Sequence, residues 1–276
     1  TWSAPEYMRY ADGRLMKHPR AANFAWRCRN GKYLYWFHNH GGRFIREHPQ
    51  RRTNAYEDRN PVWLCGGIEV DTPRGREIRW SQPEIALYDD DPYVRISYPD
   101  LVEEGGDIFL TETQKNKARV HRLDPALPAG LWAQLEGGAL PAENALLDYS
   151  AGPSAREARV ALPPLPAFTR RDAGRADYGA EDLRAGLTLE LRLTLESLEA
   201  GQVLLDNRTP EGQGFCLRTA AGGRLELTLN DGRAQSAWEC DPGELAVGRS
   251  QTVRVIVDGG PKLSLFIIDG RLNDGG

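Results

Sequence analysis

Three arginines recur at intervals that a repeated structural unit would produce. Arg20, Arg59 and Arg95 are separated by 39 and 36 residues, and each stands before a short run of strand-forming residues. A planar guanidinium binds a carboxylate through two parallel hydrogen bonds, which fixes the orientation of an acidic ligand as well as its charge. If the three occupy equivalent places in successive repeats, we expect them to converge and to bind an anionic group. The alternative is local pairing with neighbouring acidic residues such as Asp58 and Asp100.

A pair of histidines, His38 and His40, follows a strand-like run. Residues two apart on a strand share one face, and two imidazoles on one face are a geometry that a metal can use. No third ligand stands nearby in the sequence, so hydrogen bonding to a sugar is the favoured functional interpretation. The structural alternative is a pair of core or rim histidines. We predict no metal site and no cofactor.

The elements that must position these residues repeat along the first part of the chain. The phrase Trp-Ser-x-Pro-Glu occurs at residues 2–6 and 80–84, and its spacing of 78 residues fits two propeller blades of roughly 40 residues each. Residues 20–37 and 95–112 each predict a strand, a turn and a strand, and a third such unit lies between them. We therefore predict β-propeller blades over residues 1–124, without an amphipathic helix. The short strands expected there cover 33–37, 62–65, 84–88 and 107–112.

The composition changes after residue 124. Residues 125–184 are rich in Ala, Pro and Gly, which predicts a linker and the first strands leading into a second domain. Residues 187–195 then alternate strictly between apolar and polar side chains, the pattern of a half-buried strand. Similar runs separated by turn signals predict an antiparallel β-sandwich of the jelly-roll kind over residues 185–276. The further strands expected cover 202–206, 214–218, 224–229, 251–257 and 262–268. The predicted fold class is all-β, with partial propeller blades followed by the sandwich.

Both ends of the chain interrupt a pattern. The first copy of the repeated phrase begins at residue 2, and residues 269–276 predict a turn with no strand after it. A sandwich that stopped there would leave an unpaired edge, which natural proteins usually avoid. We therefore expect a piece of a longer protein, truncated at both ends.

Composition limits the classes of function. The formal net charge of −4 over 276 residues argues against nucleic acid as a partner. No apolar run approaches the ~20 residues that a membrane span requires. Four cysteines lack the paired spacing of a zinc site. The sequence allows Cys216 and Cys240 either to form one disulfide or to remain buried free thiols.

Taken together, these segments resemble the BNR-repeat, sialidase-like glycoside hydrolases, followed by a laminin-G or concanavalin A-like jelly roll. The Asp-box turn of that superfamily is Ser-x-Asp-x-Gly-x-Thr-Trp; Thr1-Trp2 is similar to its end, and Arg79-Trp80 matches a degenerate box without the Asp and Gly. Residues 185–276 are similar to the strand series of a laminin-G domain without its closing strands. The resemblance covers most of the chain. It implies a secreted or periplasmic protein whose partner is a glycan.

The same resemblance implies two catalytic residues. A late blade of such sialidases carries Tyr-Ser-x-Leu, a turn with Asp-Gly and a strand that ends in Tyr-Glu. Residues 97–101, 103–106 and 109–112 follow that order, although Pro99 stands in place of the Ser and Thr111 in place of the Tyr. The match implies Tyr98 as the nucleophile and Glu112 as its activating base.

This chemistry is coherent for an acidic sugar. A phenol with a pKa near 10 attacks poorly until a neighbouring carboxylate takes its proton. A neutral nucleophile also avoids repelling the carboxylate of the substrate. The acid/base residue of the family sits in an early blade, so it is expected upstream of Thr1.

Three functions follow from these observations. The leading hypothesis is a sialidase-like exo-glycosidase that hydrolyses a terminal acidic sugar with retention. Its expected substrate-binding residues are Arg20, Arg59, Arg95, Asp100, His38 and His40. The first alternative is a five-bladed propeller glycosidase that acts on a neutral sugar through a carboxylate pair including Asp100 or Glu112. The second is a carbohydrate-binding protein without catalysis, which the Pro99 and Thr111 departures favour.

Overall fold

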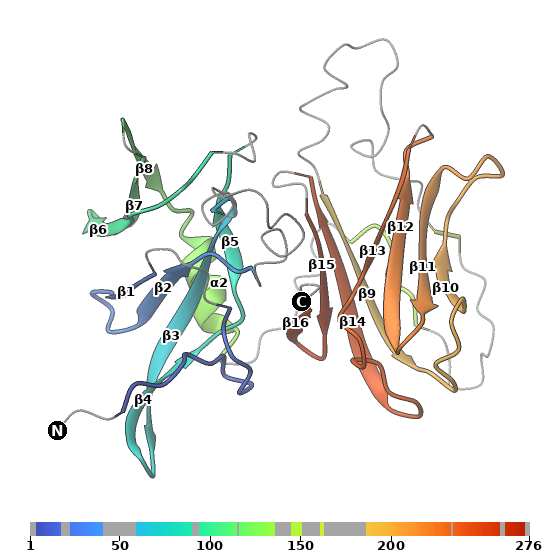
Figure 1. Ribbon diagram of the computed structural model, residues 1–276, viewed down its shortest axis with the longest axis horizontal. Coiled ribbons are helices and arrows are strands. Elements are labelled where there is room, and N and C mark those ends of the chain that lie inside the picture. Colours follow the sequence, from blue (N-terminus) through green and yellow to red (C-terminus); the bar gives the residue numbers. More distant parts are fainter. Residues whose placement is uncertain are drawn as a thin grey trace, which may run out of the picture. The chain divides into compact units, whose positions relative to one another are not determined.

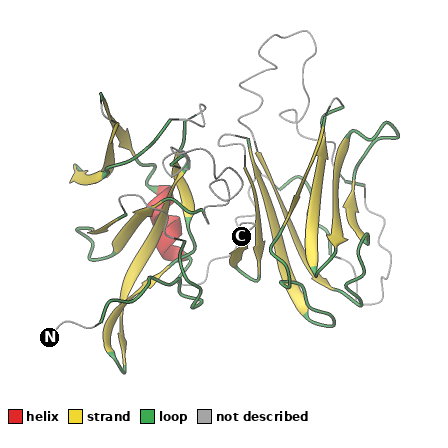
Figure 2. Cartoon of the chain, viewed as in Figure 1, coloured by secondary structure: helices red, strands yellow, loops and turns green. Residues whose placement is uncertain are grey.

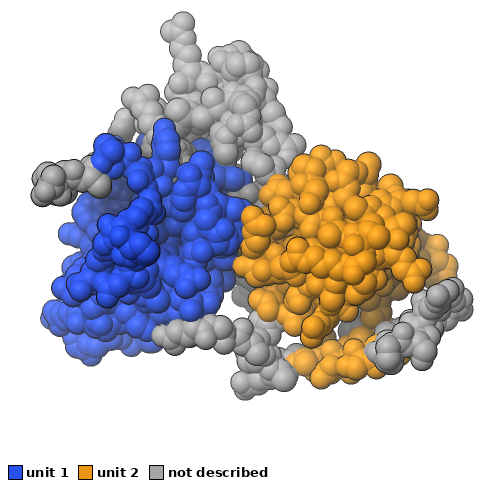
Figure 3. All heavy atoms as spheres, turned by 90° about the horizontal axis from the view of Figure 1, so that it is seen from below, with its two compact units in different colours: residues 1–139, 276 blue, residues 140–275 orange. Residues whose placement is uncertain are grey.

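The computed structural model describes residues 4–17, 23–40, 59–89, 94–114, 116–135, 145–150, 161–162, 186–232, 234–259 and 263–273. The chain divides into two compact units, Thr1–Ala139 with Gly276 and Leu140–Gly275, which Figure 3 colours separately. Antiparallel strands dominate both units, and the described residues include a single short helix (Figure 2). The predicted all-β class is confirmed. None of the helical structure described reaches the length and apolarity of a membrane span.

The larger sheet of unit 1 has the order β1-β2-β3-β4, with β5 paired to the first residues of β3 (Figure 1). Its strands are β1 (Phe24–Arg27), β2 (Tyr33–Phe37), β3 (Val62–Thr72), β4 (Gly75–Trp80) and β5 (Glu84–Leu87). Since β2 occupies one edge of β3, β4 and β5 follow one another along the other edge. Where they join, the Ser81 N–H donates to the Gly66 carbonyl at 2.8 Å, and Ser81 Oγ accepts the Gly66 N–H at 2.9 Å.

A smaller antiparallel sheet of unit 1 has the order β6-β7-β8. Its strands are β6 (Asp100–Glu104), β7 (Asp107–Gln114) and β8 (Lys117–Arg122). Gly105 and Gly106 make the β6–β7 turn with φ values of 61° and 91°, which only glycine adopts at low cost. Helix α2 (Ala126–Ala133) follows β8, and its first N–H, on Ala126, donates to the Asp124 carboxylate at 2.9 Å.

One hydrophobic core joins the two sheets and α2 in unit 1. Its buried members are Cys28, Leu34, Trp36, Val62, Leu64, Leu87, Ile96, Leu110, Leu123, Leu131 and Trp132. Helix α2 lies directly against β3: a Cβ on Gly66 would be 2.7 Å from Trp132 Cδ1 and 2.9 Å from the carbonyl carbon of Leu131. Trp132 Nε1–H also donates to the Tyr33 carbonyl at 2.8 Å. The missing side chain at Gly66 is what allows this close approach.

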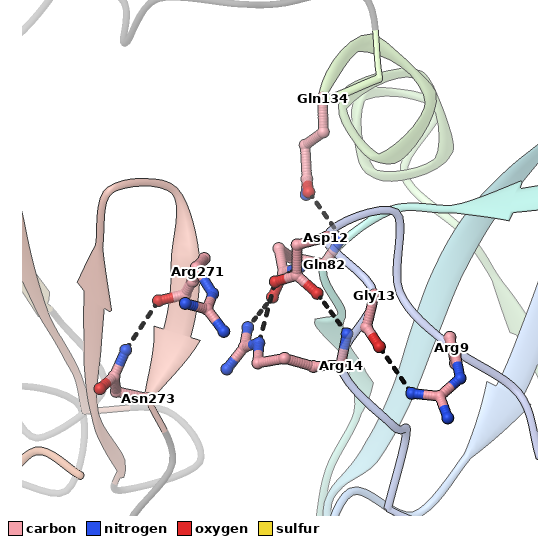
Figure 4. Close-up of polar contacts among 8 residues, drawn as sticks. All are labelled: Arg9, Asp12, Gly13, Arg14, Gln82, Gln134, Arg271 and Asn273. Carbon is pink, nitrogen blue, oxygen red and sulfur yellow. Dashed lines mark hydrogen bonds and ion pairs between the residues drawn. The ribbon is translucent and has the colours of Figure 1, made fainter. Parts of the chain in front are cut away.

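A polar network ties the segment before β1 to the rest of unit 1 (Figure 4). Asp12 and Arg14 form an ion pair of 2.9 Å, and Arg14 Nη2 donates to Gln82 Oε1 at 2.8 Å. The Gln82 N–H in turn donates to Gln134 Oε1, just beyond α2, at 3.0 Å. Gln82, where β4 joins β5, is therefore the centre of a network that reaches both the N-terminal segment and the end of the helix.

The described residues of unit 2 form two four-stranded antiparallel sheets that share one hydrophobic core. The first sheet contains β10 (Val203–Asp206), β11 (Gly214–Ala220), β12 (Arg224–Asn230) and β13 (Gln235–Glu239). The second contains β16 (Arg271–Asn273), β15 (Leu263–Ile268), β14 (Ser250–Asp258) and β9 (Gly186–Thr194). Burial alternates along β9 and β14, because successive side chains point to opposite faces of a strand.

Six strands of unit 2 lie where alternation predicts them, whereas β13 (Gln235–Glu239) was not predicted, and the end of the described residues also differs from the prediction. The prediction of a turn without a following strand at 269–276 is wrong. Asp269 and Gly270, with φ values of 51° and 76°, reverse the chain, and β16 then pairs with β15. Two residues with positive φ are enough to close a hairpin.

Helix α2 is a second difference from the sequence analysis. It lies within 125–184, the range predicted as a linker, and it packs in unit 1. Pro128 and Gly130 weaken its helical signal. Burial of Leu131 and Trp132 stabilises it instead, as is usual for short helices.

The repeated phrase has two different structural settings. Residues 80–84 span the join from β4 to β5, with Trp80 and Ser81 buried. Residues 4–6 are exposed and belong to no strand, and residues 2 and 3 lie outside the described ranges. The two strand-turn-strand predictions are nevertheless confirmed, as the hairpins β1–β2 and β6–β7.

The four cysteines are buried and free, so Cys216 and Cys240 form no disulfide. Cys240 Sγ accepts the Leu225 N–H at 3.1 Å. Burial raises the pKa of Cys240 to about 11, so its thiol is protonated at neutral pH. These sulfurs act as small core groups.

We expect Gly66→Ala to lower the free energy of unfolding of unit 1 by about 1–3 kcal/mol, because the added methyl collides with the α2 backbone. Gly130→Ala is the matched control, since no atom lies within 4 Å of its new methyl. In a helix that change is neutral or stabilising by up to ~1 kcal/mol. Urea denaturation followed by tryptophan fluorescence measures both in a Trp238→Phe background, where every remaining tryptophan belongs to unit 1. Equal stability of the two variants would contradict the described docking of α2.

Candidate functional site

The candidate site is built around residues 94–99, which connect β5 to β6 and which we call the Tyr98 segment. Hydrogen bonds hold this segment on both sides. The Ile96 N–H donates to the Arg59 carbonyl at 3.2 Å, and the Thr113 N–H donates to the Ser97 carbonyl at 2.9 Å. The ring Nε2–H of His38 donates to the Ile96 carbonyl at 2.8 Å. Residues from the larger sheet and from β7 therefore meet at this segment.

Tyr98 has a strained backbone and an exposed side chain. Its φ is 52°, a region that bulky residues occupy rarely and at a cost of about 1–2 kcal/mol. Tyr98 is 63% exposed, whereas Ser97 is 2% exposed and Pro99 is buried. Two buried neighbours thus hold an aromatic ring out toward solvent. Strain of this kind concentrates at functional sites.

Glu112 of β7 is buried beside Arg119 and His121 of β8. It is 1% exposed, and its Oε1 lies 3.4 Å from Arg119 Nε and 3.6 Å from His121 Nε2. Arg119 also contacts Asp89, with Nη1 3.1 Å from Oδ2. Asn60 fixes the Asp89 backbone in both directions, accepting its N–H at 3.1 Å and donating to its carbonyl at 2.7 Å. Arg119 therefore bridges two carboxylates that come from different loops and strands.

The predicted nucleophile and base lie on neighbouring segments. The bond between Ser97 and Thr113 joins the residue before Tyr98 to the residue after Glu112. Within the part of the chain that the structure describes, no hydrogen bond links Tyr98 to Glu112 themselves. Asp100 is exposed at the start of β6, where its Oδ1 accepts the N–H of Leu101 at 2.8 Å.

Two of the three arginines of the predicted cluster, Arg59 and Arg95, lie within the described residues. Arg59 is only 8% exposed, and its Nη1 donates to Ser97 Oγ at 2.9 Å. Arg95 is half-buried, and the bond from Ile96 to Arg59 brings the two arginines onto adjacent backbone segments. Arg20 lies outside the described residues, so the convergence of all three stays a prediction.

The two histidines are neutral at physiological pH. Burial lowers the pKa of His38 to about 4; the Arg59 charge also lowers it, and the hydrogen bond to the Ile96 carbonyl opposes the change. Burial likewise lowers the pKa of His40 to about 4, assisted by His38 and Lys17. The described residues include no group of three or more His, Cys, Asp or Glu arranged to hold a metal ion.

Sequence reasoning missed Ser97, Arg119 and His121. Arg119 and His121 are two residues apart on β8, so they share the face on which Glu112 lies. A basic residue at alternate positions of a strand opposite an acidic one is the signal that could have found them. For Ser97 no such signal exists, because its partner Arg59 is 38 residues away.

Comparison with protein-family models, with curated proteins and with solved structures finds no match to this chain in any of the three.

We expect His38 to make unit 1 lose stability as the pH falls from about 6.5 to about 4. The ordinary pKa is 6.5 and the folded pKa is about 4, so the unfolded chain binds more protons in this window and acid favours it. The loss from His38 is about 2–3 kcal/mol and levels off below pH 4. Urea denaturation between pH 4 and 7 measures it, by comparison with His38→Gln, which keeps a donor for the Ile96 carbonyl. A parallel pH dependence in the two proteins would contradict a neutral buried His38.

Replacing Tyr98 by glycine is expected to leave the stability unchanged or to raise it by up to ~1 kcal/mol. Glycine removes the strain of φ 52°, which outweighs the entropy that glycine adds to the unfolded chain. Tyr7→Gly is the control: Tyr7 is 77% exposed and is not among the residues with positive φ. That change should destabilise slightly. A marked loss at Tyr98 in urea denaturation would mean that its side chain holds the fold together.

Proposed function

We propose that this chain is part of a sialidase-like exo-glycosidase that removes a terminal acidic sugar from a glycan with retention of configuration. The observation that carries the proposal is Tyr98, whose exposed phenol is presented by a strained backbone between buried neighbours. Other tyrosines, such as Tyr7, are exposed as well, but among the described residues Tyr98 alone combines an exposed ring with a positive φ. The proposal also includes a glycan partner and a secreted or periplasmic location.

In this mechanism the phenolic oxygen of Tyr98 attacks the anomeric carbon, and its proton passes to the carboxylate of Glu112. The glycosidic bond breaks, and the leaving oxygen takes a proton from an acid residue that we assign to another part of the protein. Water then attacks the anomeric carbon of the glycosyl-tyrosine intermediate and gives its proton to the now deprotonated acid residue. The bond from the sugar to Tyr98 breaks, and Glu112 returns its proton to the phenolic oxygen, so that the second inversion gives net retention. Glu112 has to approach Tyr98 for the transfer, and such hydrogen bonds often tighten only when substrate is bound.

The charges around the site suit an acidic sugar. Arg59 and Arg95 lie on adjacent segments beside Tyr98, whereas the charge of Arg119 is taken up by Glu112 and Asp89. A cationic environment that is shielded from water attracts an anionic ligand more strongly than exposed charges do.

The strand order is compatible with the architecture that we propose for this activity. β1-β2-β3-β4 is a four-stranded antiparallel meander, as a propeller blade requires, and β6-β7-β8 has the form of part of a second blade. We propose unit 2 as a laminin-G-like jelly roll that supports the catalytic part or binds carbohydrate.

A carbohydrate-binding protein without catalysis is the second candidate. The engagement of Glu112 by Arg119 and its missing hydrogen bond to Tyr98 favour it. In that case the exposed Tyr98 ring would stack on a sugar face.

Tyr98→Phe tests the proposal by removing the nucleophilic oxygen and keeping the ring. We expect kcat for an acidic fluorogenic glycoside to fall by a factor of at least about 100 in the complete gene product, because covalent catalysis is lost. Tyr7→Phe is the matched control, because Tyr7 is also exposed but is not among the residues with positive φ. Sialosides, uronides and neutral glycosides are assayed side by side.

The outcomes separate the candidates. Turnover of an acidic sugar that collapses only in Tyr98→Phe supports the proposal. Turnover of a neutral sugar that survives in Tyr98→Phe but not in Glu112→Gln indicates a carboxylate pair. Binding of a sugar with no turnover by the folded wild-type protein indicates the binding module.

A further inference from the structure

Arg59 holds the Tyr98 segment by two contacts. Its main-chain carbonyl accepts the N–H of Ile96 at 3.2 Å, and its guanidinium Nη1 donates to Ser97 Oγ at 2.9 Å. One residue thus fixes the two positions that precede Tyr98, through the backbone at one and through the side chain at the other.

The contact between Arg59 and Ser97 lies away from water. Arg59 is 8% exposed and Ser97 is 2% exposed. A hydrogen bond with an ionised donor is among the strong ones, and low surrounding polarity strengthens it further. Loss of the Ser97 hydroxyl would remove this acceptor from a buried charged group, which costs more than loss of an exposed hydrogen bond.

Ser97 is also held from the opposite side, because its carbonyl accepts the N–H of Thr113 in β7. On the other flank of Tyr98, Pro99 is buried and its ring fixes its own φ. Between these two held neighbours Tyr98 has a φ of 52°, so its backbone strain is coupled to the contacts that hold them.

We propose that Arg59 and Ser97 are positioning residues: their buried hydrogen bond holds the Tyr98 backbone in the left-handed conformation and so aims the phenol at the ligand. Arg59 acts on Tyr98 through Ser97. This assigns it a role different from direct binding of an acidic group of the ligand. Only the kinetic part of the test rests on the proposed function; the position of the Tyr98 ring does not.

Ser97→Ala removes the acceptor and is tested beside Ser81→Ala, a matched control at the other serine that is 2% exposed. Both variants lose a buried hydroxyl, but Ser81 bonds to Gly66. The full chain is labelled with 3-fluorotyrosine, and the ¹⁹F resonance of Tyr98 is assigned by its absence in Tyr98→Phe. We expect the Tyr98 resonance to shift or broaden in Ser97→Ala and to keep its wild-type position in Ser81→Ala. Ser97→Thr, which retains the hydroxyl, should restore it.

Kinetics provide the second measurement. With an acidic glycoside as substrate, kcat of Ser97→Ala should fall by roughly 10- to 100-fold with little change in KM, since misplacement of a reacting group affects the transition state. A rise in KM at constant kcat would overturn the positioning role and return Arg59 to substrate binding. Should Ser97→Ala not fold, Ser97→Cys carries the same comparison with a similar side-chain volume and a weak acceptor.

Failure of the inference and failure of the proposed function can be told apart. If no glycoside is turned over by any variant, the enzymatic proposal fails, while the ¹⁹F comparison still decides the positioning role. An unchanged Tyr98 resonance in folded Ser97→Ala overturns the inference, whatever the activity.

Discussion

Within the described residues, no strand of one sheet of unit 1 pairs with a strand of the other, and the hydrogen bonds of residues 96 and 97 join the two sheets. Ile96 bonds to Arg59 and His38 beside the larger sheet, and Ser97 bonds to Thr113 in the smaller one. The hydrophobic core attracts the two sheets to each other, but because this attraction is non-directional it does not set their relative orientation. Hydrogen bonds with defined partners fix how the sheets meet. The relation of Tyr98 to Glu112 depends on this join, because each residue stands next to one of its members.

The polar groups at the join are unusual for a core. His38, Arg59, Ser97 and Glu112 are all among the buried residues, and the His38 ring lies edge-on to the core residue Trp36. Apolar residues of similar size would avoid the cost of removing these groups from water. A buried ion pair is weak evidence for stability, since its desolvation offsets much of its attraction. The concentration of such groups around one exposed tyrosine is therefore better explained by a site than by the needs of folding.

Sequence patterns predicted the part of the structure that rests on local alternation. The strict period of residues 187–195 corresponds to β9, and a run of six buried residues opens β3 where a shorter strand was expected. Helix α2 escaped prediction because its stability comes from burial of Leu131 and Trp132 against β3 at Gly66, and not from the helical propensity of its residues. At the site, the position of Glu112 on a strand was predictable, whereas its partners were not. The pairing of Arg59 with Ser97 joins residues 38 positions apart, and no periodic pattern encodes such a contact.

The backbone strain at Tyr98 differs in kind from the strain at Asp269. Two non-glycine residues have positive φ within the described chain, Tyr98 at 52° and Asp269 at 51°. Asp269 belongs to a hairpin turn, and its carboxylate accepts the Thr252 N–H at 2.9 Å and pairs with Arg249 at 2.9 Å. Short polar residues tolerate that conformation because their side chains bond locally. Tyr98 has a bulky ring, lies in no tight hairpin and directs its side chain to solvent. Within the described residues, its side chain does not offset the backbone strain through local hydrogen bonds, as the Asp269 carboxylate does. We therefore relate the strain at Tyr98 to binding of a ligand.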